Sequence, residues 1–466
     1  MPYDCHVLTY AKNVADQQGA PIDAGGPTLG PTELFFSTTD RRGVIGLGNS
    51  VFTRVSGYAL EELTGQPHNI VRHRDMPAGM FRLMWDRLAE GRPVGAFVRN
   101  QARNGAAYWV FAAMSPVPGG YVSVRLAPCS QYFGLAEKIY AQARIAEQES
   151  SGAGSDRRGV AASGARGLEE ALHRYGFPSY DEFMYETLPA EITARGNLVS
   201  ATSLRPYASG PIAAVLAGTA LVDERLEQMV GRLGEYQELC DRLMTAAAQV
   251  TDITRRIDRS VAAARDASAG VADEHPGLLN IAQVMGEPMR EAAATLHTLR
   301  SELDRLRAAV TQLRFRISLA SLYNSMVAAF AAEVVDSTAP AHTLKAVPLL
   351  CDTTAGGLSG MADQMHEVNA QLSTVARLSE RASTALDRFR RFLGQWRLRV
   401  LRHKAGPVIG AKLAPIDEEI AVSWEWKELL NSLGGEFLAS TITFDFVALD
   451  AQLAAIASAA AQCVPD

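Results

Sequence analysis

The stretch that decides the fold is residues 49–77, which read NSVFTRVSGYALEELTGQPHNIVRHRDMP. It contains two short helical patterns, Ser50–Ser56 and Leu60–Leu63, separated by glycine. A longer helix is expected directly behind Pro77, where the run AGMFRLMWDRLAEG ends at Gly91. A proline at the start of a helix and a glycine at its end are the usual punctuation.

Strand-like runs flank this helical stretch on both sides. Before it, LFFSTTD (34–40) and GVIGLGN (43–49) predict two short strands joined by a turn. After it, three further strands are expected at VGAFVRNQ (94–101), AAYWVFAAMSPV (106–117) and GYVSVRL (120–126). The Asn-Gly pair at 104–105 is a strong hairpin signal between the first two of these. The order predicts an α+β domain, with an antiparallel sheet and helices over one face.

Residues 34–126 resemble the PAS domain of bacterial aerotaxis receptors. The pattern N-x-x-F-x-x-x-SGY-x-x-x-EL-x-G, which begins at Asn49, is typical of PAS domains in general. The extension PHN-x-VRH-x-DMP, which ends at Pro77, narrows the resemblance to the aerotaxis type. The resemblance covers about a fifth of the 466 residues, and it implies the PAS fold.

The resemblance also implies a non-covalently bound FAD whose oxidation state reports redox status or oxygen. The residues that match the cofactor contacts of the family are His68, Arg72, His73, Asp75, Trp85 and Asn100, with Asn49 a weaker candidate. Their chemistry suits a flavin dinucleotide. Arg72 can grip phosphate oxygens with its forked guanidinium, and Trp85 offers a flat face for stacking. Asn100 can present both a donor and an acceptor to the edge of the flavin ring.

Each of these residues also has a purely structural interpretation. Arg72, His73 and Asp75 suit a solvated loop with local ion pairs. Trp85 suits the buried side of an amphipathic helix, and Asn100 suits a strand position near a turn. Two alternative functions therefore remain open: a cofactor-free PAS scaffold used for dimerisation, and a heme-binding PAS sensor with His68 or His73 as the axial donor.

The sequence departs from the family pattern in two places. The family usually carries a second tryptophan after G-x-P, where this chain has Val94 in GRPVG. The loss of that aromatic ring puts flavin retention or the flavin potential in doubt. The membrane anchor typical of the family is also missing from the sequence. A flavin–cysteine adduct is not expected, because no cysteine lies between Cys5 and Cys129.

Composition excludes several other classes of protein. A formal charge of −6 gives no basic field for nucleic acid. The five cysteines are scattered without a C-x-x-C pair, which favours a reducing compartment over disulfides or zinc. The N-terminus lacks the apolar run of a signal peptide, so a cytoplasmic location is expected. Phosphate-binding, serine-hydrolase, zinc-protease and kinase motifs are absent, so the chain is not expected to be an enzyme.

The second half of the chain shows helical periodicity in three segments, 222–261, 296–320 and 361–400. Their apolar residues recur in alternating steps of four and three, which is the coiled-coil condition. No helix of this length buries its apolar stripe alone. A helical bundle, completed by dimerisation, is therefore predicted, with hairpin breaks at Gly270–Gly277, Asp336–Ala341 and Gly406–Pro415.

Two uncharged runs need consideration as membrane spans, Tyr207–Val222 and Ile317–Ala332. Each is shorter than the ~20 apolar residues that cross a bilayer, so both are predicted to be packed helices. The region Phe315–Val335 resembles the hairpin tip of chemoreceptors in its apolar, Asn-containing run before a Glu, but it lacks the tip's Glu/Arg pattern.

These observations predict six regions along the chain. They are an irregular N-terminal arm (1–33), a PAS sensor domain (34–128), a helix with a flexible linker (129–167), a small helical unit (168–208), a coiled-coil bundle of long helices (209–403) and a mixed C-terminal segment (404–466). The role of 168–208 cannot be assigned from the sequence.

The function expected from the sequence is soluble signal transduction. A flavin-based sensor of redox state or oxygen would pass its signal through the helical region, as in aerotaxis and chemotaxis. The expected partners are a second copy, through the PAS domain and the coiled coil, and chemotaxis-type signalling proteins. No nucleic acid and no membrane span are expected.

Overall fold

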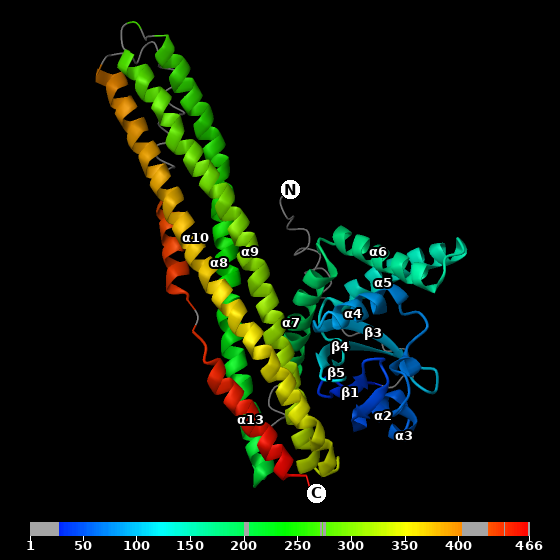
Figure 1. The fold of residues 1–466 in the computed structure, drawn as a ribbon. Helices are drawn as coiled ribbons and strands as arrows, with labels where there is room; N and C mark the ends of the chain where they lie inside the picture. The colour runs from blue at the N-terminus through cyan, green and yellow to red at the C-terminus, as the bar shows by residue number, and fades with distance from the viewer. Residues whose placement is uncertain are drawn as a thin grey trace. The chain divides into compact units, whose positions relative to one another are not determined.

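The computed structural model describes residues 28–199, 205–270, 273, 276–402, 427–441 and 443–464. The chain divides into two compact units. The first draws on Met1–Met229, Arg314–Met361 and Asp445–Asp466, and the second on Val230–Leu313 and Ala362–Phe444. Figure 1 labels the elements of both units.

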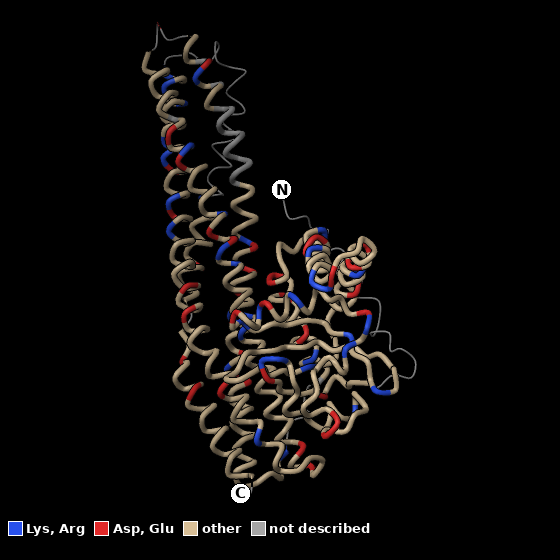
Figure 2. The backbone as a smooth tube through the Cα atoms, turned by 45° about the vertical axis from the view of Figure 1, so that its right-hand side comes forward, with Lys and Arg blue, Asp and Glu red and all other residues tan. Residues whose placement is uncertain are grey.

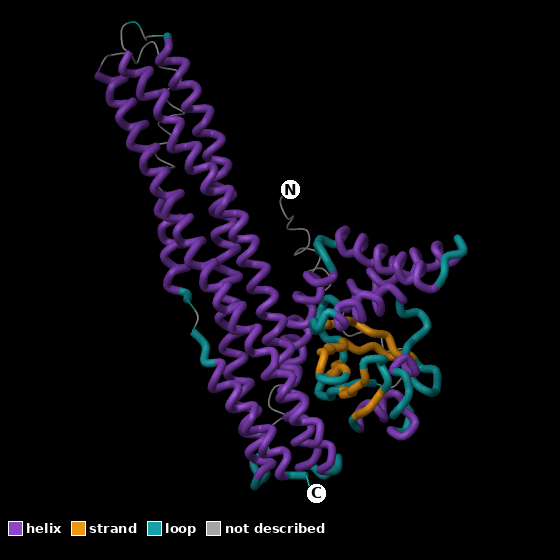
Figure 3. The backbone as a smooth tube through the Cα atoms, in the orientation of Figure 1, coloured by secondary structure: helices purple, strands orange, loops and turns teal. Residues whose placement is uncertain are grey.

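The sensor part of the first unit follows the order predicted from the sequence. Its elements are β1 (Phe35–Asp40), β2 (Ile45–Gly48), α2 (Ser50–Ser56), α3 (Leu60–Leu63), η1 (His68–Val71), α4 (Ala78–Ala89), β3 (Val94–Gln101), β4 (Ala107–Val117) and β5 (Gly120–Leu126). The five strands form one antiparallel sheet in the order β2-β1-β5-β4-β3, drawn in orange in Figure 3. The predicted α+β fold is confirmed.

The strand registers divide the sheet residues between two faces. Phe35 lies opposite Arg125, Arg125 opposite Ala112, and Asn100 opposite Tyr108. Since opposite residues of an antiparallel pair share a face, these side chains lie together on one face, here called the inner face. Helix α2 packs on it, because the Phe35 and Phe52 rings stack at 4.2 Å.

The outer face of the sheet is also covered, although the sequence analysis expected helices over one face alone. Helix α5 (Phe133–Gly152) packs there, with the Phe133 ring 5.3 Å from that of Trp109. The Tyr140 hydroxyl donates a hydrogen bond to the carbonyl oxygen of Phe97 at 3.0 Å. The expectation was wrong because β5 is buried at every position, which leaves no polar face to meet water.

Residues 150–167 are largely helical, although a flexible linker was predicted there. Helix α5 continues to Gly152, and after a short turn α6 (Arg157–Arg174) begins. Two of the glycines that suggested a linker, Gly164 and Gly167, lie where α6 approaches α5 closely. A Cβ on Gly164 would lie 2.1 Å from the Glu147 carboxylate, and a Cβ on Gly79 of α4 would lie 2.2 Å from the backbone nitrogen of Ala165.

Three long helices form the predicted bundle: α8 (Pro211–Ala269), α9 (Pro276–Val335) and α10 (Val347–Arg402). The periodic apolar residues of all three segments are buried wherever their side chains are described. The first two predicted breaks are confirmed, since α8 ends at Ala269 and α9 ends at Val335. The third predicted break, Gly406–Pro415, lies outside the described residues. Both signs of charge are interspersed along these helices (Figure 2).

Short C-terminal helices complete the bundle within the chain. In the second unit, the helix at 427–439 lies beside α8, where Glu436 pairs with Arg242 at 2.8 Å. In the first unit, α13 (Phe446–Gln462) packs on α8, and a Cβ on Gly218 would lie 2.6 Å from the Ile456 side chain. The described periodic apolar residues are therefore buried within a single chain. Dimerisation remains a prediction.

The uncharged run of α9 is buried against two partners, which explains its lack of charge. On the sensor side, Tyr323 bonds the Ser115 hydroxyl at 2.7 Å, and the Phe330 ring lies 5.3 Å from that of Phe36. On the bundle side, the Asn324 amide donates to Asp223 of α8 at 2.8 Å. By length and composition alone, helix α9 could cross a membrane. However, 61% of its most apolar segment is buried within the protein.

Replacing Gly79 with alanine should destabilise the sensor, because the new methyl group would meet the backbone of α6 rather than a movable side chain. The expected loss is about 1–3 kcal/mol of unfolding free energy. Gly134→Ala is the matched control, since nothing lies within 4 Å of a Cβ at this helical position. It should be neutral or stabilise by up to ~1 kcal/mol. Thermal unfolding of the two variants checks the prediction, and equal midpoints would contradict it.

Candidate functional site

The segment that carries most of the predicted site residues runs beside the edge strand β3. Arg72 forms a backbone bridge with Asn100, and the His73 amide donates to the Arg99 carbonyl at 3.3 Å. Pro67 starts the 3₁₀ turn η1 that leads into this segment. The chain therefore brings the backbone of Arg72 and His73 next to Asn100 and Arg99.

Polar side chains cluster on the inner face of the sheet, although the rest of the interior is apolar. Four of their polar atoms are buried without a hydrogen bond of good geometry among the described residues: Thr39 Oγ1, Asn100 Nδ2, Tyr108 Oη and Ser123 Oγ. Tyr108 and Asn100 interact with each other, since a side-chain hydrogen bond from Asn100 opposes the burial that raises the pKa of Tyr108. A buried polar group without a partner costs about 1–3 kcal/mol, so the unused hydrogen-bonding atoms on this face are candidate contacts for a ligand.

Arg125 places a positive charge in the middle of this face. Its side chain is 4% exposed, donates to the Ser37 hydroxyl at 2.9 Å and lies 4.6 Å from the Phe35 ring centre. Among the described residues, no carboxylate forms an ion pair with it. Burial lowers the pKa of Arg125 to about 10, which leaves the guanidinium protonated at neutral pH.

Sequence reasoning missed Arg125, Tyr108, Ser123 and Thr39. A signal was present in β5, where Tyr121, Ser123 and Arg125 alternate with valines. Alternation of polar and apolar residues normally places the polar ones toward water. Because the outer face is covered by helices, here the polar residues point into the domain instead.

His68 lies deep in the same region. Its ring stacks on Phe52 with a centroid distance of 5.7 Å, and Nε2 lies 3.4 Å from the Ser37 hydroxyl. Burial, followed by the charge of Arg125, lowers the pKa of His68 well below its usual value. The imidazole is therefore neutral at physiological pH.

Arg72, His73 and Asp75 lie at the rim of the domain rather than on the inner face. The Arg72 guanidinium donates to the Met76 carbonyl at 2.9 Å and covers the Phe81 ring at 4.2 Å. His73 Nδ1 accepts from the Asp75 amide at 3.1 Å, and the Asp75 carboxylate also approaches Arg99. These contacts place the three side chains at the β3 edge of the sheet, where the charges of Glu147 and Arg144 on α5 also act on Arg72.

The remaining predicted residues have distinct surroundings. Trp85 is 37% exposed and meets the edge of Tyr121 at 5.4 Å, so it closes one end of the inner face. Val94, which stands where the family has tryptophan, is fully buried on that face. Asn49 caps α2 by accepting from the Phe52 amide at 3.1 Å and also donates to a backbone carbonyl, so its amide is occupied.

The site as a whole combines buried donors and acceptors with one uncompensated cation. No group of three or more potential metal-ligating side chains occurs among the residues that the structure describes. The arrangement is chemically suited to hold a planar, electron-rich ligand with hydrogen-bonding edges and a delocalised negative charge.

His68 should make the protein less stable in mild acid. A histidine with a lowered folded-state pKa binds its proton more readily when unfolded, so stability falls as pH drops below ~6.5. We expect the pH dependence of the unfolding free energy to be shallower in His68→Gln than in the wild type, by up to about 1.4 kcal/mol per pH unit. Denaturant unfolding between pH 7 and pH 5 measures this difference. Substitution of the exposed His173 is the control, and identical slopes in wild type and His68→Gln would contradict the assignment.

Comparison with known proteins agrees with this geometry. Residues 48–123 match the family model described as PAS fold. The aerotaxis receptor of Escherichia coli (strain K12) is 42% identical over 129 residues, which cover 27% of this chain and 24% of the receptor. A nitrogen fixation regulatory protein of Klebsiella pneumoniae is 33% identical over 81 residues, which cover 17% of this chain and 16% of that protein. The chain therefore spans about a quarter or less of the length of these relatives.

Solved structures align with the same part of the chain. The light-state structure of the blue-light photoreceptor Aureochrome1 LOV aligns with a TM-score of 0.21 and 17% identity, over 22% of this chain and 88% of its own. The PAS domain of a Colwellia psychrerythraea protein aligns with a TM-score of 0.18 and 19% identity, over 20% and 85%. The family match and the relative at 42% identity, taken with the sheet and its flanking helices, show that this chain contains a PAS domain of the aerotaxis-receptor type.

Proposed function

We propose that the PAS domain binds FAD against the inner face of its sheet and senses redox state or oxygen. The observation that carries the proposal is the set of unpartnered buried polar atoms around Arg125. A flavin ring has alternating donors and acceptors along one edge, and it supplies reversible uptake of electrons and protons. The residues present therefore fit the group.

Each polar residue has a proposed role in that arrangement. Asn100 and Tyr108, which face each other across β3 and β4, would hydrogen-bond the ring edge. Arg125 would stabilise negative charge on the ring, because no carboxylate of the described residues forms an ion pair with its buried guanidinium. At the rim, Arg72 and His73 would contact the phosphates and the ribityl arm, and Trp85 would stack at the far end.

The output of the sensor is proposed to be mechanical. The outer face of the sheet contacts α9 through the buried hydrogen bond between Ser115 and Tyr323. Because Ser115 neighbours the inner-face residue Met114 on the same strand, a shift of the strand would be felt on both faces. The helical region would then relay the change, as a cytoplasmic homodimer, to chemotaxis-type signalling proteins.

A non-enzymatic role is part of this proposal. The relatives at detectable identity are named as a receptor and a regulatory protein. The inner face combines a buried arginine with neutral polar groups, and His68 is held neutral there. This combination of groups favours the binding of a ligand and the signalling of its state over the catalysis of a reaction.

The colour of the purified full-length protein tests the proposal. Protein made with ample riboflavin should be yellow, with paired near-ultraviolet and blue absorption bands, and should release FAD on denaturation. A Soret band would support the heme alternative, with His68 as a donor. A colourless protein that takes up no flavin would overturn the sensor proposal and favour a cofactor-free scaffold.

Arg125→Gln should reduce the flavin content of the purified protein by roughly tenfold, since a charge-assisted hydrogen bond contributes about 1.5–3 kcal/mol. Arg82→Gln is the matched control, because Arg82 lies on α4 with its side chain 46% exposed. The chromophore-to-protein absorbance ratio measures the effect. Equal flavin content in the two variants would exclude Arg125 from the binding site.

Arg72→Ala tests the rim of the site separately. If Arg72 contacts the phosphates, the variant should lose FAD while keeping affinity for riboflavin, which has no phosphate. Titration of the stripped protein with both compounds, followed by quenching of flavin fluorescence, distinguishes the two. Full retention of FAD would refute the phosphate contact.

A further inference from the structure

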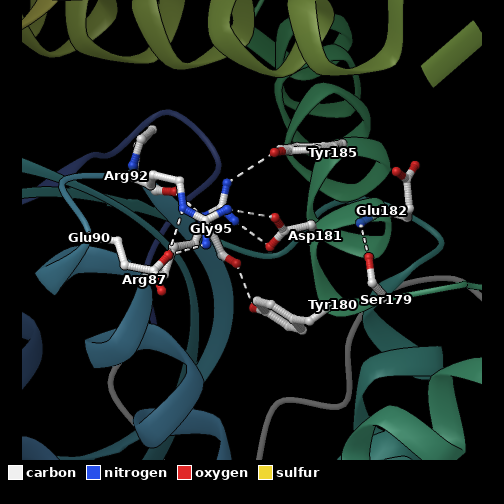
Figure 4. A network of polar contacts seen from close by, with 10 residues as sticks. Arg87, Glu90, Arg92, Gly95, Ser179, Tyr180, Asp181, Glu182 and Tyr185 are labelled. Atoms are coloured by element: carbon white, nitrogen blue, oxygen red, sulfur yellow. Dashed lines mark hydrogen bonds and ion pairs between the residues drawn. The ribbon is translucent and has the colours of Figure 1, made fainter. Parts of the chain in front are cut away.

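The corner that joins α4 to β3 is held by a network of polar contacts from helix α7 (Tyr180–Val199), shown in Figure 4. Arg87 lies at its centre and is 6% exposed. Its guanidinium pairs with Asp181, donates to the Tyr185 hydroxyl at 3.1 Å and donates to the Pro93 carbonyl at 2.6 Å. All three nitrogens of the side chain are thus used in fixing the corner against α7.

Two further contacts bind the same corner to the first turn of α7. Arg92 donates to the second carboxylate oxygen of Asp181 at 3.1 Å. The Tyr180 hydroxyl donates to the Gly95 carbonyl at 2.6 Å, and both groups are buried. Gly95 has no side chain to separate the elements, and a Cβ there would already touch Met184 of α7 at 3.4 Å.

The corner also forms one end of the inner face. Val94 points to that face and is fully buried. It lies between Pro93, whose carbonyl oxygen accepts from Arg87, and Gly95, whose carbonyl oxygen accepts from Tyr180. Any change in the contents or shape of the inner face at Val94 would therefore act on a backbone segment that is held on one side by Arg87 of α4 and on the other by Tyr180 of α7. Close-packed interiors transmit such displacements because they have little free volume.

Helix α7 continues this path to the bundle. The ring of Tyr185, which bonds Arg87 from one side, lies 5.2 Å from the ring of Phe315 on α9. Phe315 is 1% exposed and lies two residues before the uncharged run that packs on the sensor. One side chain of α7 thus contacts both the corner and α9.

We propose that α7 is a coupling element, which transmits changes at the Val94 end of the inner face to α9 through Arg87, Tyr185 and Phe315. This assigns a role to the segment 168–208. The coupling itself is a property of the packing, whereas its use as a redox output rests on the proposed flavin sensor.

Amide hydrogen exchange on the full-length protein, as purified, tests the coupling. Asp181→Asn should speed exchange roughly tenfold both at the start of β3 and around Phe315 of α9, because it leaves Arg87 without its carboxylate. Glu182→Gln is the matched control. It makes the same change of charge one residue away, where the side chain points away from the network (Figure 4). Faster exchange confined to α7 and the corner, with α9 as in the wild type, would overturn the proposal.

Tyr185→Phe keeps the test decisive if Asp181→Asn does not fold. It removes one hydroxyl group, and with it the bond to Arg87, while the ring remains against Phe315. The same two regions should exchange faster, by a smaller factor. Unchanged exchange around Phe315 in this variant would also refute the coupling.

A second measurement tests whether the coupling carries the redox signal. Exchange around Phe315 is compared in the flavin-loaded protein before and after anaerobic reduction with dithionite. The wild type and Glu182→Gln should show a difference, and Tyr185→Phe should lose most of it while keeping its flavin absorbance. Full retention of the difference in Tyr185→Phe would rule out this route. A wild type without flavin would refute the proposed function instead, and the exchange experiments on the unliganded protein would still decide the coupling.

Discussion

The structure depends on one constraint, which is that the central strands of the sensor sheet are buried on both faces. Strand β5 is buried at every position. Since each Å² of apolar surface in water costs about 25 cal/mol, neither face can remain uncovered. Helix α2 covers the inner face, and α5 covers the outer face together with α9, whose Tyr323 bonds Ser115. The sensor and the adjoining part of the bundle therefore share one core within the first unit.

Against this apolar background, the inner face is the exception that suggests function. Arg125 and its polar neighbours are buried there without enough partners, at an energetic cost that well-packed interiors avoid. The cost is reasonable where a ligand supplies the missing hydrogen bonds. By contrast, the equally buried Arg87 has a partner for every nitrogen, as expected of a group that holds the structure together. The two arginines are both buried, so the number of hydrogen-bond partners, and not burial, distinguishes a candidate binding site from a structural contact.

Sequence reasoning succeeded where the signal was local. The Asn-Gly turn, the proline and glycine at the ends of α4 and the heptad pattern from Met361 to Val400 each have a short-range physical cause, and the structure confirms them. It failed where the outcome depends on a partner distant in sequence. Gly164 suggested a flexible linker, but its missing side chain makes room for Glu147 on another helix. Arg125 was missed because the burial of its strand depends on α2, α5 and α9, which lie far from it in sequence or on other elements. Whether His68, Asn100 and the rim residues hold a flavin remains a prediction.

The way the bundle is closed has a consequence for how the chain is made. Helices α8, α9 and α10 leave the ribosome before the helix at 427–439 and α13 do. Until they emerge, the groove in which Ile456 packs against Gly218 is open to water. Nascent chains with such exposed apolar surface are prone to aggregate. A premature stop codon before Phe446 would therefore lower the yield of folded protein, although it would leave the sensor sequence intact.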